Sequence, residues 1–323
     1  MFVKRADEPA VPQLSASPFA TRLTLDEVVR DLEHLPSAPR VLPRLKQLLC
    51  DGNTAMSEVV EMVRLDPGIA ARVLQFGNSA YFSHGLRCYT VEEAVGRVGY
   101  EQIYELVATA VASQVLVRPL CTYGMEADDL WQNSVACALA AEALADRLHA
   151  DRNVAYTIGL LHSLGMVAID DWASRRQPAL RLLGKGLPLE ACEEERATLG
   201  FHQGEAGAAL LRLWAFPPVM SEPVRWQYLP GGTAAHFHLA ALLHTAKWIR
   251  TMVLHPAEQP PAPPSSLLAK LGLTFPQVEK LCDEVSVRLR LINRQLDVEV
   301  RGLSLTFPGG ERTIMQSRFR QAG

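Results

Sequence analysis

The sequence lacks an excess of charge of either sign. Its 323 residues include 32 lysines and arginines and 35 aspartates and glutamates, which gives a formal net charge of −3. Proteins that bind nucleic acid through phosphate contacts usually carry a clear positive excess, so we do not expect a nucleic-acid partner. Hydrophobic residues make up 48% of the chain and charged residues 21%, which excludes the composition of a disordered protein. The length allows one large domain or two lobes.

Cysteine is scarce, and long apolar runs are absent. The six cysteines are scattered and form no Cys-x-x-Cys pair. Because a chain this long and apolar needs no disulfides, we expect a reducing, cytoplasmic location. The longest strongly apolar stretch, residues 153–169, is too short and too polar to span a bilayer, so we expect no membrane association. Residues 1–17 contain charges but no apolar segment, so we do not expect a secretory signal.

Strand-like alternation is also rare, and helical periodicity takes its place. Apolar residues recur at helical spacing from Leu25 onward. Asp66 precedes Pro67 in the pattern of an N-cap followed by proline at the first helical position, and Thr90 with Glu93 matches a capping box. We therefore predict an all-α fold. A weak alternation near the end of the chain predicts a short C-terminal strand or tail, at Val298, Val300, Leu303 and Leu305.

Several sequence blocks are more specific than this periodicity. They are LPSAP at 35–39, LDPGIAARVL at 65–74, NSAYF at 78–82, VEEAV at 91–95 and GLLH at 159–162. At this spacing the blocks closely resemble those of HDOD domains, which are bacterial signalling modules related to the HD phosphohydrolases. The resemblance covers about residues 24–255.

The resemblance implies two packed helical lobes, about residues 24–120 and 121–255, of which the second has the topology of an HD domain. Outside this region, we expect residues 1–22 to form a flexible leader. Residues 256–264 are rich in proline and are expected to form a stiff linker. Residues 265–323 are expected to form a C-terminal helix and tail.

In HD enzymes, a histidine, a His-Asp pair and later histidines hold metal ions that activate water for phosphoester hydrolysis. This chain keeps few of those residues. The positions that match the family's ligands carry Asn133, His162, Ser163, Gln203 and Gln227. His202 becomes the match in place of Gln203 if the register shifts by one residue, and this alternative stays open.

One histidine among neutral amides offers no anionic ligand to a divalent cation. We therefore expect no bound metal, no cofactor and no catalytic residue. The resemblance then implies a non-catalytic signalling or regulatory module, which acts through protein contacts or ligand sensing. The alternative is a metal-dependent phosphohydrolase or phosphodiesterase with a modified HD site around His162 and His202.

A second group of residues points to contacts between the lobes or with a partner. It comprises Asp66, Asn78, Ser79, Tyr81 and Phe82. We expect Asn78 and Ser79 to be capping residues, and Tyr81 and Phe82 to belong to the core between the lobes or to a partner-binding patch. The partner itself stays open: a signalling protein, a small-molecule or nucleotide ligand, or a second copy of the chain.

Overall fold

The computed structural model describes residues 23–30, 53–83, 85–99, 119–183 and 188–302, together with isolated positions between 32 and 103. The predicted all-α fold is confirmed. All regular elements in these ranges are α-helices or short 3-10 helices, and the strand-type pairing described there is an isolated bridge between Leu120 and Met125. No helix in the described ranges is long and apolar enough to cross a membrane.

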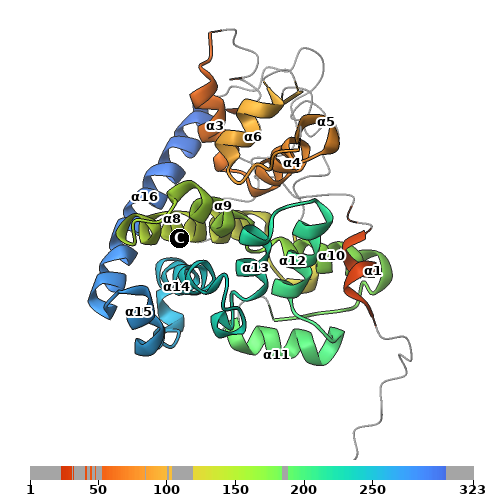
Figure 1. Ribbon diagram of the computed structural model, residues 1–323, viewed down its shortest axis with the longest axis vertical. Coiled ribbons are helices and arrows are strands. Elements are labelled where there is room, and N and C mark those ends of the chain that lie inside the picture. The colour runs from red at the N-terminus through yellow and green to blue at the C-terminus, as the bar shows by residue number, and fades with distance from the viewer. Residues whose placement is uncertain are drawn as a thin grey trace, which may run out of the picture.

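The first group of helices lies at the top of Figure 1 and consists of α3 (Met56–Arg64), α4 (Pro67–Gly77), α5 (Ala80–Ser83) and α6 (Val91–Val98). The two predicted caps are present. The Asp66 carboxylate accepts a hydrogen bond from the Ile69 amide at 2.9 Å, and the Thr90 hydroxyl accepts one from the Glu93 amide at 3.1 Å. Each cap satisfies an amide that the first turn leaves without a partner.

The second group of helices forms the body of the molecule (Figure 1). In chain order it contains η1 (Cys121–Tyr123), α8 (Ala127–Arg147), α9 (Arg152–Leu161), α10 (Leu164–Arg176), α11 (Pro188–Leu199), α12 (Gln203–Leu213), α13 (Pro218–Arg225), η2 (Pro230–Gly232) and α14 (Phe237–Leu254). The helix α1 (Leu25–Arg30) precedes the first group in sequence but packs against α10 and α12 of the second.

A glycine brings α10 and α12 close together. A Cβ atom at Gly165 would lie 1.8 Å from the carbonyl oxygen of Gln203, so only glycine allows this approach. The start of α12, which carries Gln203, is thereby fixed next to the start of α10.

The C-terminal helices cover one edge of the body (Figure 1). They are η3 (Pro256–Glu258), α15 (Ser265–Leu271) and the long α16 (Phe275–Gly302). A stripe of four residues on α16 is buried, and α16 packs against α8 and α14: Val278, Leu281, Val285 and Leu289. The prediction of a strand at Val298 and Val300 is wrong, because both residues lie in α16. Leu303 and Leu305 lie outside the described residues.

Candidate functional site

The site is built around a break between two helices. The apolar run at 153–169 is divided into α9 and α10 by His162, the C-cap of α9, and Ser163, the N-cap of α10. Both side chains are buried. The Ser163 hydroxyl lies 3.0 Å from the hydroxyl of Ser134 on α8, so the residue that replaces the family's aspartate pairs with another serine.

The two ring nitrogens of His162 have different partners. Nδ1 lies 2.7 Å from the carbonyl oxygen of Gly159, and Nε2 lies 3.1 Å from Nη1 of Arg250. A carbonyl only accepts and a guanidinium only donates, so we assign the proton to Nδ1 and the lone pair to Nε2. Burial lowers the pKa of His162 well below its usual value, and the charges of Arg250 and Lys247 lower it further. The ring is therefore neutral, and the lone pair on Nε2 accepts a hydrogen bond from the guanidinium of Arg250.

Gln227 joins His162 to a buried lysine. Its amide nitrogen donates to the carbonyl oxygens of His162, at 3.1 Å, and Val224, at 2.9 Å, while its amide oxygen accepts from Lys247 Nζ at 2.8 Å. Lys247 is 3% exposed, and Nζ lies 3.2 Å from the centre of the Tyr228 ring, a cation–π contact. We call His162, Gln227, Lys247 and Arg250 the basic cluster.

Lys247 and Arg250 of this cluster come from α14 and were not identified from the sequence. They are the only Lys, Arg, Asp or Glu residues between 237 and 254. Two basic residues in an otherwise apolar helix were the feature of the sequence that could have identified them. Among the described residues, no ion pair with a carboxylate involves Lys247 or Arg250.

The side-chain amides of the other two predicted ligand positions, Asn133 and Gln203, bond outside the basic cluster. Asn133 donates to the carbonyl oxygen of Asp129, one turn earlier in α8, at 2.8 Å. Gln203 donates to Glu195 through its backbone nitrogen at 2.7 Å and its side chain at 3.2 Å. The Glu195 carboxylate also accepts from the hydroxyl of Tyr123 at 2.9 Å. Burial raises the pKa of Glu195 to about 7.

His202, the alternative to Gln203, caps its own helix. Its Nδ1 accepts from the amides of Gly204, at 3.0 Å, and Glu205, at 3.3 Å. Burial lowers the pKa of His202 to about 4, which keeps the ring neutral and able to accept. One of its ring nitrogens is thus engaged by the first turn of α12.

A small cavity of about 10 Å³ lies beside the Ser134–Ser163 pair, between α4 of the first group of helices and the second group. It is large enough for about one water molecule. Its lining includes Pro67, Gly68, Ser134, Ser163, Leu164 and Val167.

Comparison with known families assigns residues 35–230 to the HDOD domain model. The chain belongs to the HDOD domain family. A curated relative from Treponema pallidum (strain Nichols), described as an uncharacterized protein, is 24% identical over 201 residues. These are 61% of this chain but only 38% of that protein.

Solved structures support the same fold. The MmoQ response regulator from Methylococcus capsulatus str. Bath matches with a TM-score of 0.60 and 20% identity, covering 77% of this chain and 98% of that one. A virulence factor from Campylobacter jejuni matches with a TM-score of 0.58 and 18% identity, covering 78% and 92%. The HDOD fold is therefore shared with proteins of different described roles.

The predicted interlobe residues of this HDOD chain divide into two kinds. Asn78 is a buried capping residue: its amide donates to the Cys88 carbonyl at 3.2 Å and accepts from the Cys88 amide at 2.8 Å. Ser79 donates to the Phe76 carbonyl at 2.7 Å. Tyr81, in contrast, is 81% exposed, so its prediction as a core residue between the lobes is wrong. Phe82 is partly exposed and stacks edge-on against Tyr81.

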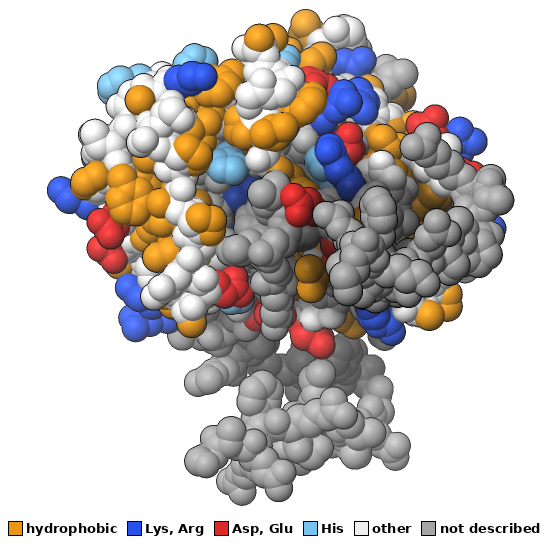
Figure 2. All heavy atoms as spheres, turned by 90° about the horizontal axis from the view of Figure 1, so that it is seen from below, with side chains coloured by type: hydrophobic (Ala, Val, Ile, Leu, Met, Phe, Trp, Pro, Cys, Tyr) orange, Lys and Arg blue, Asp and Glu red, His pale blue; other side chains and the backbone are white. Residues whose placement is uncertain are grey.

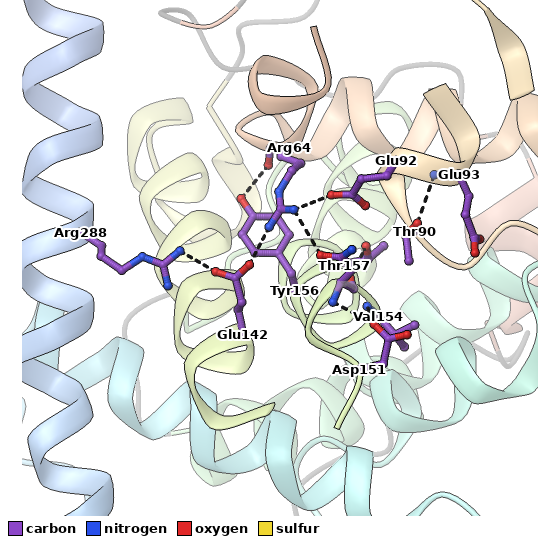
Figure 3. A network of polar contacts seen from close by, with 11 residues as sticks. Arg64, Thr90, Glu92, Glu93, Glu142, Asp151, Val154, Tyr156, Thr157 and Arg288 are labelled. Carbon is purple, nitrogen blue, oxygen red and sulfur yellow. Dashed lines mark hydrogen bonds and ion pairs between the residues drawn. The ribbon is translucent and has the colours of Figure 1, made fainter. Parts of the chain in front are cut away.

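The first and second groups of helices of the HDOD chain are joined by an ion-pair network (Figure 3). Arg64 at the end of α3 pairs with Glu92 of α6 and, at 2.8 Å, with Glu142 of α8. The other oxygen of Glu142 accepts from Arg288 of α16 at 2.5 Å. The Arg64 guanidinium also lies 4.1 Å from the centre of the Tyr156 ring. The buried Glu142 thus binds Arg64 of α3 through one oxygen and Arg288 of α16 through the other.

Proposed function

We propose that this chain is a non-catalytic HDOD module of bacterial signal transduction, located in the cytoplasm, which acts through a protein partner or by sensing a ligand. The observation that carries the proposal is the bond between Arg250 and Nε2 of His162. This nitrogen is the atom that a metal-ligating histidine in this position would offer.

The chemistry of the basic cluster disfavours a divalent metal. A metal site needs lone pairs and anionic donors, but here the histidine lone pair accepts from Arg250 and the glutamine oxygen accepts from Lys247. The positive charge of Arg250 would repel a divalent ion in the same space, whereas burial lowers the pKa of Lys247 well below its usual value. No group of three or more His, Cys, Asp or Glu residues suited to a metal is found among the described residues.

The signalling part of the proposal is supported by surface features and by similarity. The MmoQ chain is described as a response regulator. In this chain, four apolar residues within a short segment are at least partly open to solvent: Phe76, Tyr81, Leu86 and Tyr89. Exposed apolar groups mark contact sites for other proteins where they form one contiguous patch. The face in Figure 2 mixes basic, acidic and apolar side chains.

Metal analysis tests the catalytic question. The purified full chain, expressed with added manganese, iron and zinc, is analysed for bound metal and assayed for phosphodiesterase activity with and without Mn²⁺. We expect no stoichiometric metal and no metal-dependent hydrolysis. A tightly held stoichiometric metal whose removal abolishes hydrolysis would instead establish the alternative, a phosphohydrolase with a modified HD site.

A further inference from the structure

The outward face of α16 carries apolar side chains that are open to solvent. Val287 is 47% exposed and Leu291 is 54% exposed, and their spacing of four residues places them next to each other on the helix surface. The buried stripe that includes Val285 and Leu289 lies on the opposite side of α16, which packs against α8 and α14. Figure 1 shows α16 along the outer edge of the molecule. The face with Val287 and Leu291 is therefore accessible to a second molecule.

Charge is distributed unevenly along the exposed positions of α16. Before Val287, these positions carry three acidic residues and one basic residue: Glu279, Lys280, Asp283 and Glu284. After it, the exposed charged side chains described up to residue 294 are both arginines, at 290 and 294. Like charges four residues apart, as at 279 and 283 or at 290 and 294, repel each other on a helix. Each half of the face would thus be stabilised by opposite charge from another molecule.

Asp283 and Arg294 are exposed, and neither takes part in an ion pair within the described part of the chain. The midpoint between Val287 and Leu291 is residue 289. From this midpoint, Asp283 lies about 9 Å toward the start of the helix and Arg294 about 7.5 Å toward its end, at a rise of about 1.5 Å per residue. In two antiparallel copies of α16 that share this midpoint, Asp283 of one copy therefore lies nearly level with Arg294 of the other.

The two charged residues also lie on the same flank of the apolar face. Asp283 is four residues before Val287 and Arg294 is seven residues after it, and both spacings bring a residue back to nearly the same side of a helix. A twofold axis through the midpoint sets this flank of one helix against the same flank of the other. The two helices can then form the Asp283–Arg294 contact twice.

We propose that α16 is the contact surface of a homodimer, in which two copies of the helix lie antiparallel and bury Val287 and Leu291 around a twofold axis. Asp283 of each copy pairs with Arg294 of the other, which makes the interface self-complementary. A parallel arrangement would place like charges opposite each other. One helix face is smaller than the about 800 Å² that a stable interface buries on each partner, so the dimer is weak. The inference goes beyond the proposed function, because the interface contains no residue of the basic cluster.

Sedimentation velocity of the full chain, from micromolar to near-millimolar concentration, tests this inference. We expect a monomer–dimer equilibrium. Leu291→Glu should raise the dissociation constant by about 10-fold or more, which corresponds to about 1.4 kcal/mol, because it places two carboxylates in the apolar centre of the interface. Leu213→Glu is the matched control, since this leucine on α12 is also 54% exposed, and it should leave the equilibrium unchanged. Circular dichroism checks that both variants fold.

Charge exchange tests the antiparallel pairing itself. Asp283→Arg and Arg294→Asp each place like charges opposite each other, so each variant alone should dimerise more weakly than the unaltered chain. The double variant exchanges the two charges and should recover dimerisation. An equimolar mixture of the two single variants should also form a dimer, because one then offers two arginines where the other offers two aspartates.

The inference is overturned if the chain stays monomeric at every concentration, in which case the face binds a different partner or none. A dimer that Leu291→Glu does not weaken, or that Leu213→Glu weakens equally, would place the interface elsewhere and also overturn it. Failure of both the double variant and the mixture to recover dimerisation would overturn the antiparallel pairing. Metal analysis of the same sample bears on the proposed function alone, so the two proposals fail independently.

Discussion

At the scale of single residues, the chemistry of the site depends on the hydrogen-bond partner of each donor and acceptor. The motif predicts the position of His162 but not its partners. Gln227 and Arg250 lie 65 and 88 positions away in the chain, and no local rule connects residues so distant. The caps at Asp66 and Thr90, by contrast, act within three residues and follow from local chemistry.

Glu195 provides a test at this scale, because burial raises its pKa from 4.5 to about 7. As the pH rises between these values, the unfolded chain loses its proton first, so the free energy of unfolding falls, by about 3 kcal/mol in full. The variant Glu195→Gln has no proton to lose, and this part of the fall should disappear. Urea unfolding at pH 5 and pH 8 measures the difference, and the same pH dependence in both proteins would contradict it.

At the scale of elements, the sequence predicts helices well but can misjudge where they end. Val298 and Val300 alternate over too few residues to specify a strand, and they continue the helix whose buried stripe includes Leu281 and Val285. Contacts with α8 and α14 fix α16 in place, which is a tertiary effect that propensity does not capture.

The contact between α16 and α8 makes a matched pair of variants informative. Arg288→Ala removes one of the two arginines on buried Glu142 and should lower the free energy of unfolding by about 1 to 2 kcal/mol. Arg290→Ala on the same helix removes an exposed side chain that bonds to Ser286, and should change it by about 0.5 kcal/mol or less. Chemical denaturation measures both, and equal effects would show that the Glu142 contact does not stabilise α16.

At the scale of the whole molecule, the HDOD fold joins two groups of helices at one junction. Arg64 and Glu142 connect α3 to α8 (Figure 3), and a small cavity lies between α4 and the start of α10. The family resemblance correctly predicts this helical architecture. It does not predict that α1 packs against α10 and α12, or that Tyr81 faces solvent, because both depend on how the elements are placed in space.

The central claim is that the lone pair on Nε2 of His162 accepts a hydrogen bond from Arg250 and does not bind a metal. Nitrogen-15 NMR of the histidine side chains, with His162 assigned by comparison with His162→Gln, tests it most directly. We predict a neutral ring at pH 6 with its proton on Nδ1, and no change in the Nε2 signal on addition of one equivalent of Zn²⁺. A Zn²⁺-dependent shift of Nε2, at a saturating ratio of one metal per chain, would contradict the account.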